Sequence, residues 1–207
     1  MNLKTFLVVL IFCINVNLFA SEQYKMVFDL LDNDKKIGTM ESSCIETQGG
    51  SLKYINSIKI KTSFLFFDYF YTYKEEALVT NSKLIQLKIY EDDNGQIKEI
   101  IPLIENKMIT YENGKRLMFE EIDYFPFNLN LKKQKKSFHK EEFSLQTFDP
   151  LNGDIIIEDF YHLGSDQKYK FNVKSKEGNE IRVYNKNIKL IYMKNELFES
   201  RLLKDSK

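Results

Sequence analysis

The chain has little of several residue types on which whole protein classes depend. Its 207 residues include no Trp, 2 Cys, 2 His, 3 Pro and 8 Gly. Neither histidine has a second ligand at zinc-site spacing, so no metal site is predicted. The scarcity of Pro and Gly excludes a collagen-like or low-complexity chain. Because phosphate-binding loops, dinucleotide fingerprints and nucleophile elbows are also missing, the sequence predicts no cofactor and no recognisable catalytic residues.

An excess of charge of one sign is missing as well. Lys and Arg number 30 and are balanced by 30 Asp and Glu. Nucleic-acid binding normally needs a basic surface, so nucleic acid is not a predicted partner. What the chain does have is 43% hydrophobic residues, among them 17 Phe and 12 Tyr. This supply is enough for the core of a single domain of this length.

Residues 1–20 have the layout of a secretory signal peptide. Lys4 is the single charge, an apolar run covers residues 5–19, and the small Ala20 precedes a polar stretch. The apolar run is shorter than the roughly 20 residues that span a bilayer. We expect cleavage near Ala20 and a single domain over residues 21–207, periplasmic or secreted and not membrane-spanning. The alternative is an uncleaved membrane anchor.

Cleavage would also leave the protein with a single thiol. It would remove Cys13 and keep Cys44, so an internal disulfide could not form. Cys44 lies in a predicted strand, where a small buried hydrophobic side chain is the favoured interpretation over a nucleophile.

Alternation of apolar and polar residues between turns predicts an all-β fold. In residues 167–174, for example, Tyr169, Phe171 and Val173 alternate with polar side chains. Turn signals such as Asp32–Lys36 and Asp92–Gly95 separate such segments. We read about twelve strands with connections too short for parallel pairing. The prediction is therefore a mainly antiparallel, curved meander sheet or half-barrel.

The stretch from Tyr124 to Pro150 lacks clean alternation and predicts one crossover over the sheet. Ser137 could cap a short helix from Phe138 towards Gln146. The same stretch is rich in lysine, which suggests contact with anionic lipids or an acidic partner. A solvated loop is the alternative. The candidate anionic-surface contacts are Lys132, Lys133, Lys135 and Lys136.

The most unusual segment is aromatic on both faces. Taken as one strand, residues 64–73 place Phe64, Phe66 and Phe70 on one side and five apolar side chains on the other. One face would meet the core, and the other would meet either the crossover or an apolar ligand. Core packing is the alternative to a ligand site. The candidate ligand-binding residues are Phe67, Tyr69, Tyr71 and Tyr73.

Two pairs of adjacent carboxylates could suggest acid–base chemistry. They are Glu75-Glu76 and Asp92-Asp93. Adjacent residues of a strand point to opposite faces, so neither pair converges on one point. We therefore assign them no catalytic role.

The chain contains a series of short segments: Lys36-Ile37-Gly38, Phe67-Asp68-Tyr69-Phe70-Tyr71 followed by Glu75-Glu76, Asp92-Asp93-Asn94-Gly95, Phe125-Pro126-Phe127-Asn128, Phe148-Asp149-Pro150-Leu151-Asn152-Gly153 and Leu163-Gly164. In this order they resemble a family of exported bacterial proteins with a domain of unknown function. The family is similar in architecture to the lipoprotein-carrier (LolA-like) half-barrels. The resemblance implies a curved antiparallel sheet in the periplasm, with a concave apolar surface able to hold a lipid or acyl chain.

These observations lead to three functional hypotheses. The first is a non-enzymatic periplasmic protein that binds or carries an apolar or lipid-like ligand on its curved sheet. The second is a structural or protein-interaction module of the cell envelope, which docks a partner through a sheet edge or the lysines. The third, an enzyme acting on envelope glycans or lipids, is least favoured because recognisable catalytic motifs are missing.

Overall fold

The computed structural model describes most of the chain after residue 20. The described residues are 21–47, 49–64, 67–81, 83–123, 136–164, 169–176, 178–185, 190–195 and 199–206. Residues 1–20, on which the predicted signal peptide falls, lie outside them. The first strands are β1 Ser21–Asp32, β2 Lys35–Glu46, β3 Leu52–Phe64, β4 Phe67–Thr80, β5 Lys83–Asp93, β6 Gln96–Ile100, β7 Leu103–Glu105, β8 Met108–Thr110 and β9 Arg116–Met118. Two 3₁₀ turns and six strands follow: η1 Phe119–Glu121, η3 Ser137–His139, β10 Glu142–Phe148, β11 Ile155–His162, β12 Tyr169–Ser175, β13 Gly178–Tyr184, β14 Leu190–Lys194 and β15 Glu199–Ser206.

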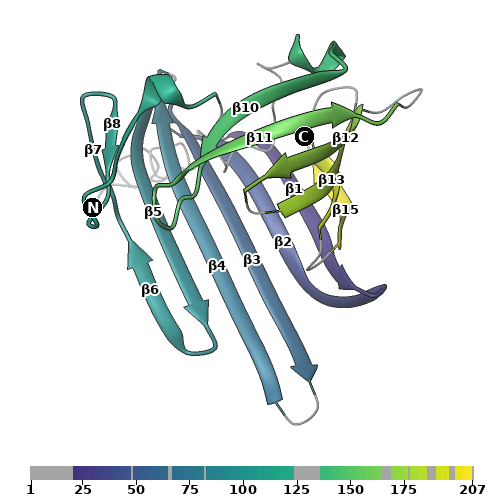
Figure 1. Cartoon of the computed structure of the whole chain (residues 1–207). Helices are drawn as coiled ribbons and strands as arrows, with labels where there is room; N and C mark the ends of the chain where they lie inside the picture. Colours follow the sequence, from purple (N-terminus) through teal and green to yellow (C-terminus); the bar gives the residue numbers. More distant parts are fainter. Residues whose placement is uncertain are drawn as a thin grey trace, which may run out of the picture.

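The predicted all-β, antiparallel fold is confirmed. Twelve strands form one curved sheet in the order β10-β11-β12-β13-β14-β15-β1-β2-β3-β4-β5-β6, which does not close into a barrel. Strands β7, β8 and β9 make a second, small sheet. The large sheet consists of two meanders: the chain runs from β1 out to one edge at β6, crosses to the opposite edge at β10, and returns to pair β15 with β1 (Figure 1).

The turns follow from residues that adopt positive φ without a large penalty. Asn33 and Asp34, with φ of 48° and 63°, join β1 to β2. Asn94 and Gly95, with φ of 52° and 91°, join β5 to β6. Both central positions of a type I′ hairpin turn need positive φ, so these sequences fix the reversal between strands. The hairpin turns predicted at these two places are confirmed.

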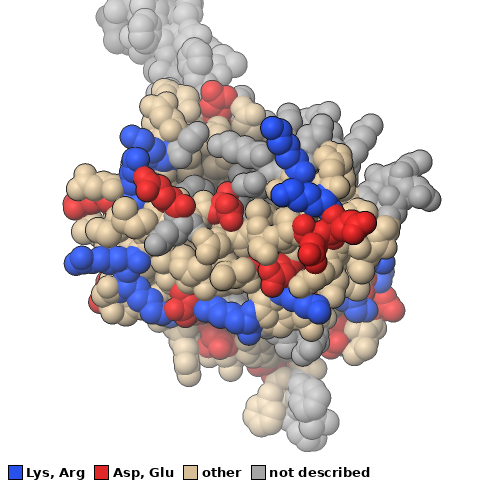
Figure 2. All heavy atoms as spheres, turned by 45° about the horizontal axis from the view of Figure 1, so that its top comes forward, with Lys and Arg blue, Asp and Glu red and all other residues tan. Residues whose placement is uncertain are grey.

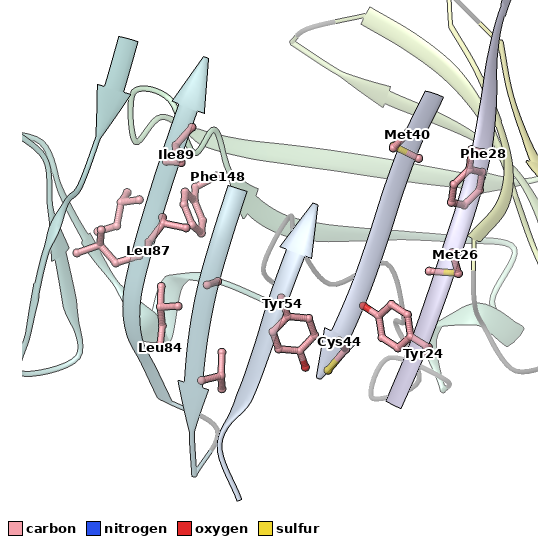
Figure 3. Close-up of a cluster of buried hydrophobic side chains, with 14 of the residues drawn as sticks. Tyr24, Met26, Phe28, Met40, Cys44, Tyr54, Leu84, Leu87, Ile89 and Phe148 are labelled. Atoms are coloured by element: carbon pink, nitrogen blue, oxygen red, sulfur yellow. The ribbon is translucent and has the colours of Figure 1, made fainter. Parts of the chain in front are cut away.

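The core lies on the inner face of the curved sheet. Alternate residues of β1, Tyr24, Met26, Phe28 and Leu30, are all buried there. Cys44 and Tyr54, on the two following strands, continue the same layer (Figure 3), and Cys44 is buried as predicted. Covering side chains come from the small sheet and the start of the second meander. They are Ile109, Tyr111, Leu117 and Phe148.

A second aromatic core fills the other half of the sheet. Phe138, from the 3₁₀ turn η3, is completely buried among rings of β10–β13. Its ring centroid lies 4.9 Å from that of Tyr184 and 5.2 Å from that of Phe171, both in edge-to-face geometry. Phe143, Phe160 and Tyr169 complete the surroundings. Among the described residues of the crossover, Phe138 thus covers this part of the inner face.

The predicted helix from Phe138 towards Gln146 is wrong. Only residues 137–139 form a helical turn, and Gln146 lies inside strand β10. Lys140, where a helix would continue, is extended with ψ of 153°. From Glu142 on, the backbone hydrogen bonds go to β11 instead of to the next helical turn. Tertiary pairing thus overrides a weak local preference.

The prediction that residues 64–73 form one strand is also wrong, because the chain reverses between Phe64 and Phe67. Phe64 and Phe67 are paired residues of a β3–β4 hairpin. The hairpin outlasts its neighbours: β2 pairing ends at Ile60 and β5 pairing ends at Tyr71. The described residues at this end, 61–64 of β3 and 67–70 of β4, therefore extend beyond the sheet at the bottom of Figure 1, and we name them the projecting ribbon.

Replacing Phe138 tests how far this one side chain holds the second core. We expect Phe138→Ala to lower the free energy of unfolding by about 3–5 kcal/mol, since it leaves a cavity among five rings. Chemical denaturation measures the loss. Ile157, 51% exposed on β11, provides the control: Ile157→Ala should change stability by less than about 0.5 kcal/mol. Equal losses in the two variants would contradict the assigned role of Phe138.

Candidate functional site

The four aromatic residues predicted to bind a ligand lie on the inner face of β4, in order of increasing exposure. Tyr73 packs against the core, and Tyr71 is half-buried. Tyr69 is 38% and Phe67 76% exposed. Ile60 of β3 is paired with Tyr71 and belongs to the same face. We name Ile60, Phe67, Tyr69 and Tyr71 the open inner surface: Ile60 is partly buried at the margin of the core, and exposure increases from Tyr71 to Phe67.

Carboxylates border this surface along β5. Tyr71 and Tyr73 are paired with Asp93 and Glu91, respectively. The Tyr71 hydroxyl donates a hydrogen bond of 3.0 Å to Glu91 Oε1. Burial, and secondarily this bond to an anion, raise the pKa of Tyr71 well above its usual value. Tyr71 therefore stays neutral at any physiological pH, with its ring available for apolar contact.

A row of polar side chains crosses the covered part of the same face. Ser42, Asn56 and Glu75 are successive cross-strand partners on β2, β3 and β4. Apolar rows flank them on both sides, with Cys44 and Ala77 in one and Met40 in the other. Asn56 Nδ2 donates to Glu75 Oε2 at 3.3 Å, whereas no described donor makes a hydrogen bond to Glu75 Oε1. The sheet thus buries a carboxyl group that is only partly satisfied by the described residues.

Burial determines the protonation of Glu75. The side chain is 3% exposed, and desolvation raises the pKa of its carboxyl to about 7. Hydrogen bonding from Asn56 and Tyr73 opposes this shift by favouring the charged form. Its neighbour Glu76 points to the opposite, outer face. There, hydrogen bonds from Lys53 and then Lys74 lower the pKa of Glu76 to about 2.

The two carboxylates of the Glu75-Glu76 pair therefore do not converge, in agreement with the alternation of a strand. Sequence reasoning treated Glu75 only as half of that pair and missed its place among buried residues. The sequence did contain an indication of burial: in a strand, Glu75 lies on the same face as Tyr73, Ala77 and Val79. Recognising it required knowing which face of β4 is covered.

A second buried charge cluster was also missed, on the inner face of the second meander. Arg182 of β13 donates from Nη1 and Nη2 to the two oxygens of Glu158 on β11, at 2.9 and 2.6 Å. It also contacts Glu180, and its guanidinium lies 5.7 Å from the centroid of the Phe160 ring. Such a bidentate, stacked arginine links the strands on either side of β12.

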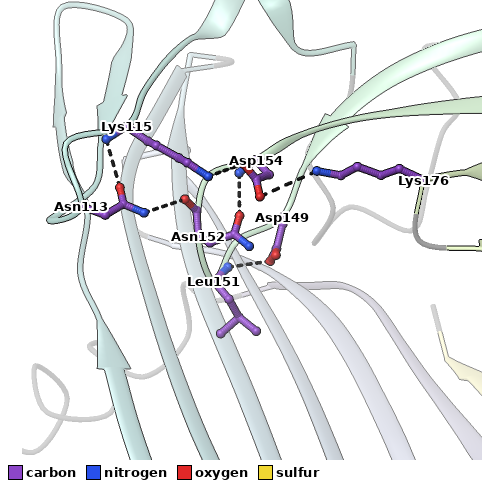
Figure 4. A network of polar contacts seen from close by, with 7 residues as sticks. All are labelled: Asn113, Lys115, Asp149, Leu151, Asn152, Asp154 and Lys176. Carbon is purple, nitrogen blue, oxygen red and sulfur yellow. Dashed lines mark hydrogen bonds and ion pairs between the residues drawn. The ribbon is translucent and has the colours of Figure 1, made fainter.

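Polar contacts join the small sheet to the β10–β11 connection, the two elements that cover the middle of the inner face (Figure 4). Asn113 Nδ2 donates to the Asn152 carbonyl at 3.2 Å, and Lys115 forms an ion pair with Asp154. Lys115, and secondarily Lys176, hold the pKa of Asp154 below its usual value. These contacts join the β8–β9 hairpin to the β10–β11 connection, which directly follows the buried Phe148 at the end of β10.

Gly153 makes this close approach possible. Its φ is +74°, and an added Cβ would lie 2.6 Å from the Tyr111 ring. Both the backbone conformation and the space therefore require glycine.

The remaining candidates do not gather into a site. Lys136 is exposed beside η3, while Lys132, Lys133 and Lys135 lie outside the described residues. His162 Nδ1 accepts a hydrogen bond from the Gly164 N–H at 3.1 Å, and His139 lies against the Tyr169 ring. Within the described part of the chain, no cluster of three His, Cys, Asp or Glu side chains could hold a metal ion.

The surface charges are mixed. Figure 2 shows basic and acidic side chains interspersed over one face of the molecule. Many are in ion pairs across neighbouring strands, such as Lys88 with Glu99 and Lys25 with Glu41. Exposed pairs of this kind contribute little to stability. Among the described residues, no helix is long and apolar enough to cross a membrane.

Comparisons with known proteins agree with this architecture. Residues 28–196 match a family described as "Domain of unknown function (DUF6134)". A solved structure, a beta-barrel-like protein of the domain of unknown function DUF1849 from Brucella abortus, is similar with a TM-score of 0.63 and 10% sequence identity. The similarity covers 88% of this chain and 96% of the other, and at this identity it concerns the fold alone. A search of curated proteins finds no match.

Replacing Glu75 tests the buried carboxyl. A folded-state pKa of about 7, against 4.5 for an exposed glutamate side chain, means that the folded protein binds the proton more tightly. Stability contributed by this group is therefore fully present below pH 4.5 and is lost as the pH rises to 7. We expect Glu75→Gln to stabilise the protein at pH 8, by up to about 3 kcal/mol, and to change little at pH 4.5.

Denaturation of both proteins across this pH range measures the effect. Glu76→Gln, on the outer face, is the matched control and should not reproduce the stabilisation at pH 8. If Glu75→Gln destabilises the protein equally at both pH values, then Glu75 is ionised and satisfied in the folded state.

Proposed function

The chain belongs to the DUF6134 family, and from its curved sheet we propose that it binds or carries an apolar, lipid-like ligand in the periplasm or outside the cell, without chemical conversion. The observation that carries this proposal is the open inner surface. It continues the face that elsewhere forms the core, yet its aromatic rings remain exposed, up to 76% at Phe67.

The chemistry of this surface suits a molecule with a long apolar part. Ile60, Tyr69 and Tyr71 offer adjacent apolar contacts across two strands. Tyrosine combines an apolar ring with a hydroxyl that can orient a polar head group. Glu91, half-buried beside Tyr71, supplies an acceptor at the margin. An acyl chain laid along β4 would thus meet apolar rings with polar groups at its side.

Binding is favoured over catalysis by the titratable groups at this surface. Burial raises the pKa of Tyr71, and the pKa of Tyr69 is also raised. Neutral tyrosines do not exchange protons readily near neutral pH, whereas a general acid or base works best with a pKa near the pH of the reaction. The surface therefore supports contact with a ligand better than proton transfer.

The location outside the cytoplasm rests on the sequence of residues 1–20. A short positive start, an apolar run and Ala20 before a polar stretch are typical of a cleaved signal peptide. A single remaining thiol, Cys44, is compatible with an oxidising compartment because it is buried.

Mass spectrometry of the protein purified from its own cells tests both the bound ligand and the cleavage of the signal peptide. Native spectra should contain a species heavier than the denatured protein, and solvent extraction should release a lipid. The denatured mass should correspond to a chain that begins near Ser21. Absence of a bound molecule in native spectra and extracts would contradict the ligand proposal. A denatured mass that still includes residues 1–20 would contradict cleavage.

Variants locate the ligand on the surface. Tyr69→Ser/Tyr71→Ser should lower the bound fraction by roughly tenfold or more, since burying one large apolar side chain contributes on the order of 1.5–3 kcal/mol. Tyr161→Ser is the matched control: Tyr161 is 37% exposed, as Tyr69 is 38% exposed, but lies on β11. Equal retention of ligand by both variants would place the ligand elsewhere.

A further inference from the structure

The projecting ribbon exposes apolar side chains on both of its faces. Phe67 and Tyr69 lie on the inner face, and Phe70, 45% exposed, lies on the outer face. Among the described residues, 61–64 and 67–70 are paired only with each other, apart from a backbone hydrogen bond of 2.8 Å from the Asn94 N–H to the Phe70 carbonyl. An isolated two-stranded hairpin is only marginally stable in water. The ribbon therefore has the properties of an element that is covered from both sides by an apolar partner.

The order of side chains along the ribbon matches the layers of a lipid surface. Phe67 lies at the end, and Tyr69 and Phe70 follow. Lys59 and Lys61 are exposed on the outer face of β3, and Lys61 Nζ lies 5.1 Å above the Phe70 ring. Aromatic rings prefer the interface of a bilayer, and lysines reach from apolar surroundings to anionic head groups.

One charge close to the end of the ribbon limits how deeply it enters. Asp68 accepts a hydrogen bond of 2.6 Å from the Ser63 hydroxyl across the hairpin. A carboxylate is costly in the hydrocarbon layer, so Asp68 has to remain at the depth of the head groups. Phe67, on the opposite face of the ribbon, can pass below that depth.

We propose that the projecting ribbon docks this protein on the surface of a lipid bilayer, with Phe67 between the lipids and with Lys59 and Lys61 at anionic head groups. A bilayer is favoured over a protein groove because Phe67 lies at the end of the ribbon, whereas Lys61 lies level with Phe70 and Lys59 lies farther back, in the order of an apolar layer and anionic head groups. The inference goes beyond ligand binding. Phe67 and Tyr69 belong to both surfaces, whereas Phe70, Lys59 and Lys61 lie on the outer face and are not part of the open inner surface, so docking does not require a bound ligand.

The absence of Trp from the chain permits a site-specific test. The full-length Phe67→Trp variant carries a single tryptophan at the ribbon. With vesicles of phosphatidylcholine and phosphatidylglycerol, its emission should shift to shorter wavelength, and brominated lipids should quench it. Ile157→Trp is the matched control, since Ile157 is 51% exposed on β11, and it should show neither effect. This readout reports the ribbon itself, whichever other segment contacts the vesicles.

Charge reversal tests the lysines. Lys59→Glu/Lys61→Glu in the Phe67→Trp background should lower the affinity for the anionic vesicles by about tenfold or more. The same change should have a much smaller effect with vesicles of phosphatidylcholine alone. Both lysines are exposed, so the folded structure should be retained, which circular dichroism checks.

Three results would overturn the proposal. The first is an unchanged emission of the Phe67→Trp variant with both kinds of vesicle. The second is an equal shift in the Ile157→Trp variant. The third is a shift that appears without vesicles and grows with protein concentration, because it would show that a second copy of the chain covers the ribbon. Ligand binding is tested by a different measurement, the co-purification of a lipid with the protein. A failure of docking can therefore be distinguished from a failure of the ligand proposal.

Discussion

The pairing of β1 with β15 is the interaction on which the rest of the structure depends. Lys25–Leu31 of the first strand are hydrogen-bonded to Glu199–Ser206 of the last. Without this pairing the two meanders would be separate six-stranded sheets, each with an additional unpaired edge. With it, they form one curved sheet whose two halves share an inner face, so that Phe148 from one edge strand packs in the same core as Leu87 from a strand near the other edge.

The curvature creates an inner face that is unevenly covered. The small sheet and the β10–β11 connection bury its middle, where Glu75 is held among apolar residues at a cost in desolvation. Phe138 covers the second meander. Towards the end of the β3–β4 hairpin this cover ends, and the same face presents exposed aromatic rings. A protein that must keep an apolar surface available to a ligand would be expected to leave part of its core face uncovered in this way.

The exposed rings differ in what they can contact. Tyr69 and Tyr71 remain beside the body of the sheet, where Glu91 and Ile60 are their neighbours. Phe67 and Phe70 lie on opposite faces of a ribbon that extends past its neighbours β2 and β5 (Figure 1). The first pair is suited to a single molecule laid against the sheet, and the second to surroundings that are apolar on all sides. Both proposals therefore follow from one length difference: β3 and β4 are longer than the strands beside them.

The sequence by itself determined the local features of this protein. Asn94-Gly95 imposes a tight reversal because both residues accept positive φ, and alternation along β1 or β12 assigns each side chain to a face because the period of a strand is two. Only the tertiary structure decided which strands meet and which faces are covered. One of the two partners of β1, strand β15, lies about 170 residues away, and nothing in either strand specifies that pairing locally. For the same reason Glu75 could be placed on a face but not recognised as buried. Gln146 was placed in a helix, although in the folded protein it pairs with β11 as part of the sheet.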